Sequence, residues 1–433
     1  MEILHDPAFT VVRVPEGPSG MAWLRAHVAR FSEGEDHRRR RGLAVRLLEE
    51  IDPASLRRPG HPVAALASAL GLPPTVSADV ELAAAHYQPH DGTTPEADAA
   101  VARLVSACGG AWSEDTAARI GLLVQACAAT RAYIAGAETP VPATRRVAPS
   151  GEEILVSLRD APFGAGRHAC PGEAHARAIA DGATVFRRLH HADEPLLLPN
   201  AWDVASAAVL VQEGFAAVGT TSLGVAATHG KPDAAGATRR ETLALARSLV
   251  ELSVPISVDV EAGFGANPAE LARELSAIGV AGVNLEDGRG TDLESVAVQC
   301  ALISAFKAAA PELFVNARVD TDWLSVRTSE TTMRARAYAD AGADGVFVPG
   351  LRAPDEIENL VRTLGEVPLN LLAELPFDRL RDLGVRRVST GSLLFRSALT
   401  QAARTAVAYR TGQAIPEAMS YDDVEGARLR SRR

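Results

Sequence analysis

The sequence feature that most constrains the fold is a regular alternation of short apolar segments with longer amphipathic segments in the second half of the chain. The short segments predict β-strands, because they are apolar runs bounded by turn residues. The longer segments predict helices, because their apolar residues lie three and four positions apart. The predicted strands cover residues 196–198, 217–220, 256–260, 282–285, 314–317, 345–348, 369–372 and 387–389.

Eight strand–helix units within about 250 residues are typical of a TIM (β/α)8 barrel. An open, doubly wound sheet is the alternative, but eight regular units favour closure. We therefore predict an α/β fold in which residues 183–433 form a TIM barrel, preceded by a mostly α-helical N-terminal domain over residues 1–182. Active sites in such barrels lie at the C-terminal ends of the strands.

Polar side chains gather at those predicted strand ends. Asp259 and Glu261 share one face of the third strand, and Glu286 follows the fourth. Arg318 ends the fifth strand and Asn370 lies in the seventh. Carboxylates suit a hard cation such as Mg²⁺, and an arginine suits a substrate carboxylate or phosphonate. Acids that simply face water, or a salt-bridge network between Glu286 and Arg318, are the structural alternatives.

This set resembles the isocitrate lyase/phosphoenolpyruvate mutase superfamily from about residue 196 to residue 401. The segments that carry the resemblance are Asn200-Ala201-Trp202-Asp203, Thr221-Ser222-Leu223, Gly230-Lys231-Pro232-Asp233, Asp259-Val260-Glu261-Ala262-Gly263-Phe264-Gly265, Gly282-Val283-Asn284-Leu285-Glu286-Asp287 and Asn316-Ala317-Arg318-Val319-Asp320-Thr321.

The resemblance implies a lyase or mutase that acts on a small 2-oxo or 2-hydroxy carboxylate or phosphonate. It implies an enolate-type intermediate, cleavage or formation of a C–C or P–C bond, and Mg²⁺ held largely through waters by Asp259, Glu261 and Glu286. It also implies homo-oligomers, dimers or tetramers, that exchange their last barrel helices. We assign catalysis to Arg318, Glu286 and Asn370, and expect the anionic substrate to contact Trp202, Asp203, Val204, Ala205, Ser222 and Arg318.

One departure from the family concerns the catalytic acid. Family lyases carry a Lys-Lys/Arg-Cys-Gly-His loop after the third strand, and mutases carry a Lys- and Asn-containing loop near the fourth. Here Glu286 is followed by a short segment, 287–293, that has no Cys, His or Lys. The proton donor is therefore unidentified, with Asp287 or Arg289 as guesses, and isocitrate or methylisocitrate lyase activity is not expected.

A second motif lies in the first part of the chain, at residues 162–172. It places Cys170 in a Gly-rich loop just before a predicted helix, 173–179. The helix N-terminus and the neighbouring Arg167 and His168 are expected to favour the thiolate form of Cys170. The loop resembles the cysteine-ligand loop of the cytochrome P-450 haem-thiolate monooxygenases.

That resemblance implies a haem whose iron is bound by Cys170 and whose propionates contact His37, Arg41 and Arg146, with His168 in the same loop. Residues 126–130 resemble the oxygen-activating helix, with Thr130 at the threonine position and Cys127 where glycine is usual. The family's domain is much longer, and its Glu-x-x-Arg pair is missing upstream of Cys170. We interpret this part as a shortened relative; the alternative is a degenerate helical domain that keeps the loop for packing.

Composition narrows the partners and the compartment. The net charge of −10 disfavours nucleic acid as a partner. No apolar run is long enough to span a bilayer, and the N-terminus does not resemble a secretory signal. Four scattered cysteines without paired spacing indicate a reducing, cytoplasmic location. Residues 421–433 are expected to be a frayed end.

Three functional hypotheses follow. The leading hypothesis is the Mg²⁺-dependent lyase or mutase described above. The second is a haem-binding redox or sensor protein for which the barrel is a scaffold. The third is a non-catalytic interaction protein built from two degenerate domains, against which the intact set of metal-binding acids argues.

Overall fold

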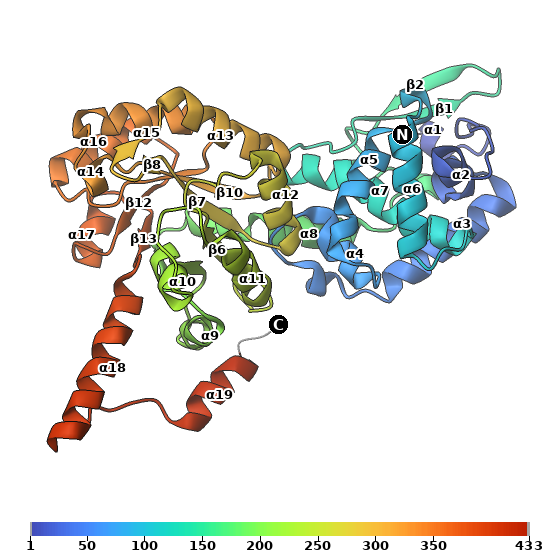
Figure 1. Cartoon of the computed structure of the whole chain (residues 1–433). Coiled ribbons are helices and arrows are strands. Elements are labelled where there is room, and N and C mark those ends of the chain that lie inside the picture. The colour runs from blue at the N-terminus through green and yellow to red at the C-terminus, as the bar shows by residue number, and fades with distance from the viewer. Residues whose placement is uncertain (1, 431–433) are drawn as a thin grey trace. The chain divides into compact units, whose positions relative to one another are not determined.

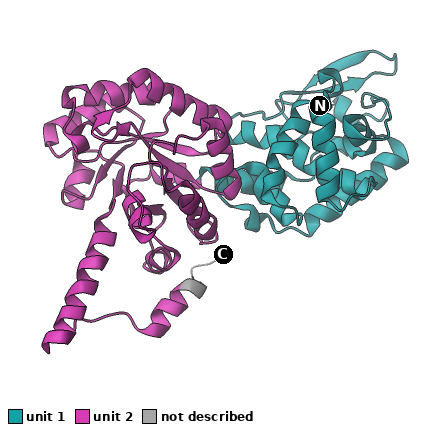
Figure 2. Cartoon of the chain, in the orientation of Figure 1, with its two compact units in different colours: residues 1–184 teal, residues 185–433 magenta. Residues whose placement is uncertain are grey.

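The computed structural model describes residues 2–430. The chain divides into two compact units, here called unit 1 (residues 1–184) and unit 2 (residues 185–433) (Figure 2). The first unit ends at residue 184, two residues after the predicted boundary at residue 182. Among the described residues, no helix is both long enough and apolar enough to cross a membrane.

Unit 2 contains one large parallel sheet, and all the strands predicted from the sequence take part in it. Along the chain its strands are β3 (Leu196–Leu198), β4 (Asn200–Ala201), β5 (Val218–Thr220), β6 (Ile256–Asp259), β7 (Gly282–Glu286), β10 (Phe314–Arg318), β11 (Gly345–Phe347), β12 (Leu369–Leu372) and β13 (Arg387–Ser389).

The first predicted strand is β3, and a further short strand, β4, follows it after Pro199, which has no N–H to donate to a strand ladder. Before Pro199, β3 pairs with β13, and after it β4 pairs with β5. The two ends of the nine-stranded sheet are therefore consecutive pieces of chain, and the sheet is nearly closed into a barrel. Because every neighbouring pair is parallel, the predicted α/β barrel is confirmed.

Helices alternate with these strands around the barrel (Figure 1). A short antiparallel hairpin, β8 (Gly288–Arg289) and β9 (Asp292–Leu293), follows β7. The helices are α9 (Val204–Gln212), α10 (Ser222–Thr228), α11 (Arg239–Leu249), α12 (Pro268–Ile278), α13 (Val296–Ala309), α14 (Thr321–Leu324), α15 (Thr331–Asp340), α16 (Pro354–Leu364), α17 (Phe377–Asp382), α18 (Leu393–Thr411) and α19 (Tyr421–Arg430).

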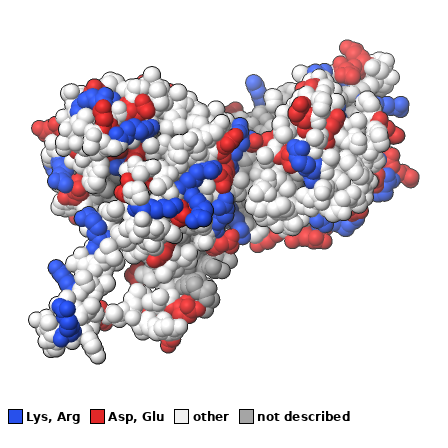
Figure 3. Space-filling model, viewed as in Figure 1, with Lys and Arg blue, Asp and Glu red and all other residues white. Residues whose placement is uncertain are grey.

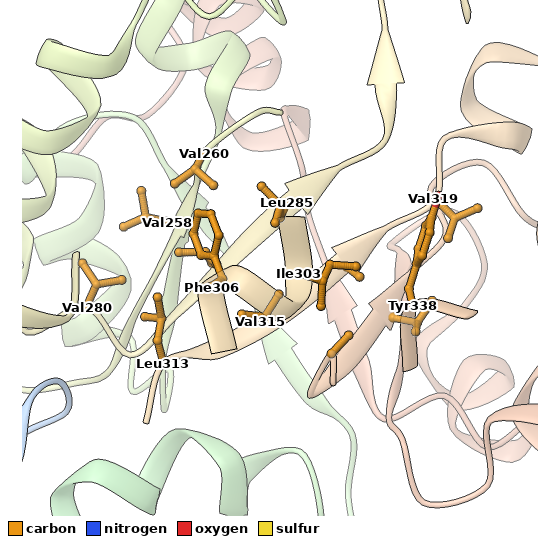
Figure 4. Close-up of a cluster of buried hydrophobic side chains, with 14 of the residues drawn as sticks. Val258, Val260, Val280, Leu285, Ile303, Phe306, Leu313, Val315, Val319 and Tyr338 are labelled. Carbon is orange, nitrogen blue, oxygen red and sulfur yellow. The ribbon is translucent and has the colours of Figure 1, made fainter. Parts of the chain in front are cut away.

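The main core of unit 2 lies between the strands and the helices. Val258 on β6, Leu285 on β7 and Val315 on β10 pack in one buried cluster with Ile303 and Phe306 of α13 (Figure 4). Strand side chains alternate between two faces. The residues between these apolar positions therefore point into the barrel, which is where the predicted site residues of β6, β7 and β10 lie.

Unit 1 is mostly helical, as predicted, and its apolar core is separate from that of the barrel. Its helices and strands are α1 (Glu2–His5), α2 (Gly20–His27), α3 (Gly34–Glu49), α4 (Pro62–Ala69), α5 (Ser77–Ala85), α6 (Pro95–Ala107), α7 (Glu114–Ile134), β1 (Ala143–Val147), β2 (Glu153–Ser157) and α8 (Glu173–Leu189).

Two local predictions in unit 1 were wrong. The Pro-, Thr- and Arg-rich composition of residues 136–150 predicts a loop, yet β1 forms there because it pairs with β2 along its whole length. The helix predicted at 173–179 extends to Leu189, because its later apolar residues are also buried. In both places tertiary contacts outweigh local composition.

The expectation of a frayed tail was also wrong for the part that the structure describes. Residues Tyr421–Arg430 form α19, which contacts α9. Arg432 and Arg433 lie outside the described residues. The preceding helix α18 extends away from the barrel (Figure 1) and buries only Phe395 and Ala408.

Candidate active site

An ion-paired cluster occupies the C-terminal ends of β7 and β10. Glu286 and Arg318 are partners in the strand register, and Arg318 Nη1 lies 2.7 Å from Glu286 Oε2. Arg318 Nε donates to Asp320 Oδ1 at 2.7 Å. The salt bridge that was the structural alternative is therefore present, and it joins the two residues that were predicted to be catalytic.

The carboxylates around Arg318 are crowded. Burial raises the pKa of Glu286 to about 8, and the charges of Asp259, Asp320 and Glu261 add to that effect, so together they outweigh the attraction of Arg318. Burial likewise raises the pKa of Asp259 against the lowering effect of Arg318. Crowded, buried carboxylates of this kind gain most from a nearby cation.

Glu261 has a different role from the one predicted by strand alternation. It lies beyond β6 with a positive φ of 50°, and it is 2% exposed. Its two carboxylate oxygens accept hydrogen bonds from the Gly236 amide at 2.6 Å and the Thr238 hydroxyl at 2.7 Å. Glu261 therefore anchors the loop between α10 and α11, and a non-glycine residue held in this conformation is a mark of functional sites.

The anchored loop carries an acid that the sequence analysis quoted but did not assign. The charge of Asp233 contributes to the raised pKa of Asp259, so the two carboxylates lie near each other. The signal was present in the segment Gly230-Lys231-Pro232-Asp233, which follows the second strand. Residue spacing alone did not show that this loop is tied to Glu261.

The acids at the mouth fit a hydrated divalent cation better than a directly bound one. Across residues 2–430, no three His, Cys, Asp or Glu side chains lie close enough together to bind one metal ion directly. Asp259 and Glu286 have the oxygen donors that Mg²⁺ prefers. Glu261 accepts one hydrogen bond on each oxygen, and each oxygen keeps a second lone pair that can accept from a water of such an ion.

The predicted substrate-binding residues surround the start of α9. Asp203 caps this helix, and its side chain accepts from the Ser206 amide at 2.7 Å. The amides of Val204 and Ala205 have no hydrogen-bond partner among the described residues. Such free amides at a helix N-terminus bind anions.

Two more predicted substrate-binding residues lie near by. The Trp202 ring packs edge-on against Phe395 at 5.3 Å between ring centroids. Ser222, at the start of α10, is half-buried.

The short segment after Glu286 has a structural role. Asp287 is 0% exposed and accepts hydrogen bonds from the Asp320 amide, the Tyr338 hydroxyl and Arg334 Nη1 at 2.8, 2.7 and 3.0 Å. Arg289 donates to two nearby carbonyl groups. Asp287 is thus fully engaged, which argues against it as the missing catalytic acid; Arg334 and Tyr338 were not identified from the sequence.

Asn370 lies in a buried polar cluster inside the barrel. It is 1% exposed, and its Oδ1 accepts from the Ser389 hydroxyl at 3.2 Å. Ser389 in turn is bonded to Arg387, and Arg387 to Asn284, two residues before Glu286. The structure therefore links Asn370 to the mouth through other side chains and gives it no direct contact with Glu286 or Arg318.

The residues predicted to bind haem lie around one cavity in unit 1. The cavity has a volume of about 430 Å³, and its lining includes Cys170, His37, Arg41, Arg146 and His168. Thr130 and neighbouring residues of α7 line the same cavity. The imidazole rings of His37 and His168 lie 4.2 Å apart, and the Nε2 atom of each is buried without a hydrogen-bond partner among the described residues.

The expected thiolate character of Cys170 was wrong for this structure. Cys170 is exposed to the cavity, yet burial by the surrounding protein raises the pKa of its thiol, and the bond from the Gly172 amide and the charge of Arg41 only partly oppose this. Arg167 does not help, because it is engaged with Glu33 and the Phe9 carbonyl. Burial lowers the pKa of His168 to about 4, so the imidazole carries no charge near neutral pH.

The nearly closed parallel barrel, with acids and an arginine at the C-terminal ends of its strands, places the chain among the TIM-barrel proteins. The family model for phosphoenolpyruvate phosphomutase matches residues 186–410. This covers about half of the chain, and the chain belongs to that family, within the isocitrate lyase/phosphoenolpyruvate mutase superfamily. It is accordingly an enzyme of a family of lyases and mutases.

Individual relatives agree with this assignment. An uncharacterized protein of Mycobacterium tuberculosis is 44% identical over 248 residues, which are 56% of this chain and 95% of that protein. The 2-methylisocitrate lyase of Bacillus subtilis is 32% identical over 206 residues, 44% of this chain and 66% of that enzyme. A phosphonopyruvate hydrolase solved with oxalate and Mg²⁺ shares the fold, with a TM-score of 0.51 and 24% identity over 57% of this chain and 96% of that one.

Proposed function

We propose that unit 2 is a Mg²⁺-dependent lyase or mutase that acts on a small 2-oxo or 2-hydroxy carboxylate or phosphonate. The observation that carries this proposal is the crowding of Asp259 and Glu286 beside Arg318 at the barrel mouth, with raised pKa values for both acids. The reaction would break or form a C–C or P–C bond through an enolate-type intermediate. The bound Mg²⁺ would act as a Lewis acid that stabilises negative charge on the substrate oxygen.

The chain's own residues would divide the remaining work. Asp259 and Glu286 would hold the cation, and Glu261 would reach it through water. Arg318 would bind an anionic group of the substrate, which requires Glu286 to turn from Arg318 towards the cation. The free amides at Val204 and Ala205 would bind a substrate carboxylate, beside Trp202, Asp203 and Ser222.

Asn370 would act on the reaction indirectly. Its amide oxygen accepts from Ser389, which is linked through Arg387 to Asn284, so we propose that Asn370 holds this cluster in place. Asp287 and Arg289 are both hydrogen-bonded within the protein, so neither side chain is free to transfer the proton. We propose that another residue of the site transfers it.

Isothermal titration with Mg²⁺ and oxalate tests the proposal, because oxalate mimics an enolate with two anionic oxygens. The wild-type protein should bind oxalate only when Mg²⁺ is present. Asp259→Ala should abolish both binding events, whereas Asp340→Ala, which removes an acid paired on the outside of α15, should change neither. Mg²⁺-independent oxalate binding, or equal binding by Asp259→Ala, would contradict it.

We also propose that unit 2 assembles as a dimer or tetramer by exchange of its last helices. The helix α18 has three arginines and no acidic residue, and it leaves Leu399 and Tyr409 55% and 77% exposed. In Figure 3 this projecting helix shows mainly uncharged atoms. Light scattering on the full chain should give twice or four times the mass of one chain, and a monomer would contradict the proposal.

A second function is favoured by the cavity of unit 1. We propose that this unit is a shortened haem-thiolate domain, in which Cys170 would bind the iron and the Nε2 atoms of His37 and His168, with Arg41 and Arg146, would bind the propionates. The buried Nε2 atoms make no hydrogen bond among the described residues, so they fit anionic groups that accept one. His168 would have to turn from Glu33 Oε1, which lies 3.4 Å away, to do so. The haem would supply redox chemistry, either as part of an enzyme or as a sensor for which the barrel is a scaffold.

An absorption spectrum of the haem-supplied full chain tests this second function. Reduced protein with carbon monoxide should show the red-shifted Soret band of a thiolate ligand, and Cys170→Ala should lose it. A protein that takes up no haem, or a spectrum that Cys170→Ala leaves unchanged, would contradict it.

A further inference from the structure

The barrel interior contains an arginine to which the proposed reaction gives no role. Arg387 on β13 is 0% exposed. Its side chain crosses the barrel, because Nη2 donates to Asn284 Oδ1 on β7 at 3.1 Å although three strands separate β13 from β7 in the sheet. Its Nε donates to the Ser389 hydroxyl at 3.1 Å, and its Nη1 has no partner among the described residues.

A buried guanidinium without a paired carboxylate is costly to keep. Burial lowers the pKa of Arg387 to about 9, and the charge of Asp259 is the one that opposes this. Arg387 therefore lies close enough to Asp259 to act electrostatically on that carboxylate. Because burying this charge is unfavourable, a role in the neighbouring site explains Arg387 better than packing does.

The contacts of Arg387 fix the orientation of one amide. Asn284 Oδ1 receives two donors, Arg387 Nη2 at 3.1 Å and Asn316 Nδ2 at 2.9 Å. An amide oxygen accepts and an amide nitrogen donates, so two donors on one atom identify that atom as the oxygen. The Asn284 Nδ2 group is left on the other side, without a partner among the described residues.

That free amide group has one open direction. Asn284 is the register partner of Asp259 and lies two residues before Glu286. Below it, the barrel floor is closed by a buried apolar cluster that includes Phe186 and Phe314. Asn284 keeps 5% exposure where Asn316 keeps 1%, so part of its side chain is still accessible. With the floor closed, we infer that this part faces the mouth.

We propose that Asn284 is a substrate-binding residue whose Nδ2 donates a hydrogen bond to an anionic oxygen of the substrate, and that Arg387 is the positioning residue that fixes this amide. The inference rests on the proposed function of the barrel and adds a requirement for its substrate. One oxygen acceptor, of a carboxylate or an enolate, must point down into the barrel between Asp259 and Arg318. Arg387 also places a positive charge beneath that oxygen.

Titration of the full chain with Mg²⁺ alone, and then with oxalate at saturating Mg²⁺, separates the two roles. Asn284→Leu has a similar shape without the donor, so its oxalate affinity should fall roughly 10- to 100-fold while its Mg²⁺ affinity stays within about twofold. Ser257→Ala, which changes an equally buried residue of the same interior, is the matched control and should leave both affinities unchanged.

Arg387→Met should move the two affinities in opposite directions. Oxalate should bind more weakly, because the Asn284 amide loses its hydrogen bond from Arg387 and the nearby positive charge is removed. Mg²⁺ should bind more tightly, because a positive charge near Asp259 has gone. Arg387→Lys, which keeps the charge, should restore the Mg²⁺ affinity to the wild-type value, and it provides a second variant if the methionine variant does not fold.

The outcomes distinguish this inference from the proposed function. If the wild type binds Mg²⁺ and oxalate and Asn284→Leu binds oxalate equally well, the inference is overturned and the proposed function stands. If a folded Arg387→Met loses affinity for both ligands in parallel, the role of Arg387 is only structural and its part in the inference is overturned. If the wild type binds neither ligand, both proposals fall.

Discussion

The barrel mouth and the unit 1 cavity differ in how their charged groups are satisfied. At the mouth, Arg318 is paired with Glu286 and Asp320, and the acids are crowded. In the cavity, the buried Nε2 atoms of His37 and His168 make no hydrogen bond among the described residues, and that of His168 lies 3.4 Å from Glu33 Oε1. Crowded acids suit a small cation, whereas a large cavity with separated basic groups suits a large ligand with anionic edges. One chain thus combines two candidate sites with different binding chemistry.

The largest expected effect is a loss of Mg²⁺ binding at the mouth that leaves the unit 1 cavity unchanged. Asp259→Ala removes a carboxylate that would hold the cation, and we expect it to weaken Mg²⁺ binding at least about 100-fold, since a hydrogen-bonded charge contributes several kcal/mol in a buried site. Titration calorimetry measures this effect. The haem spectrum of the same variant should match the wild type, and a change in that spectrum would show that the two sites are not independent.

The converse variant tests the cavity. Cys170→Ser should abolish the thiolate-type Soret band of the haem-supplied protein, because a hydroxyl does not replace a thiolate ligand. Its Mg²⁺ and oxalate titrations should be those of the wild type. Retention of the band would mean that another residue binds the iron, and the comparison between the two sites would lose its basis.

The next effect concerns the support beneath the mouth. Arg334→Leu leaves the fully buried Asp287 with one donor fewer and without its ion pair, so unit 2 should lose about 3 kcal/mol of unfolding free energy. Tyr338→Phe removes one neutral donor to the same carboxylate and should cost about 1–3 kcal/mol. Urea unfolding measures both losses. If both are negligible, the bonds to Asp287 do not stabilise unit 2.

A pH dependence of stability is also expected, and Glu286 at the mouth gives it the opposite sign to His168 in the cavity. The pKa of Glu286 rises from 4.5 to about 8 on folding, so between these values the folded protein binds a proton that the unfolded chain has lost. Its stabilising effect is therefore complete below pH 4.5 and is lost as the pH rises towards 8. Thermal unfolding without Mg²⁺ should show this trend, and Glu286→Gln should reduce it.

The same titration controls metal binding. Mg²⁺ binds the charged carboxylate, so its affinity should increase as the pH rises towards 8 and then level off. Titrations at several pH values measure this, and an affinity that falls over the range would contradict the assignment of Glu286.

Much of the barrel could be predicted from the sequence, because each strand and helix has its own periodic pattern. The positions of Asp259, Glu286 and Arg318 followed from strand alternation and from their place at strand ends. The ion pair between Glu286 and Arg318 is a contact between neighbouring strands, and their shared register brings it about.

What could not be predicted depends on contacts between distant segments. The bonds from Gly236 and Thr238 to Glu261, and from Arg334 and Tyr338 to Asp287, join elements that no local pattern connects. Nothing in the sequence around Arg387 predicts that it is buried, because its burial depends on closure of the barrel. The raised pKa of Cys170 likewise depends on the surroundings of the cavity.

The central claim is that the barrel mouth binds a divalent cation beside a substrate anion. A crystal structure of the full chain with Mn²⁺ and oxalate, located by the anomalous scattering of Mn²⁺, tests it most directly. The account predicts the metal at Asp259 and Glu286, with Glu261 linked through water and Glu286 turned away from Arg318. A metal bound elsewhere, or an oxalate at the mouth with no metal beside it, would contradict the account.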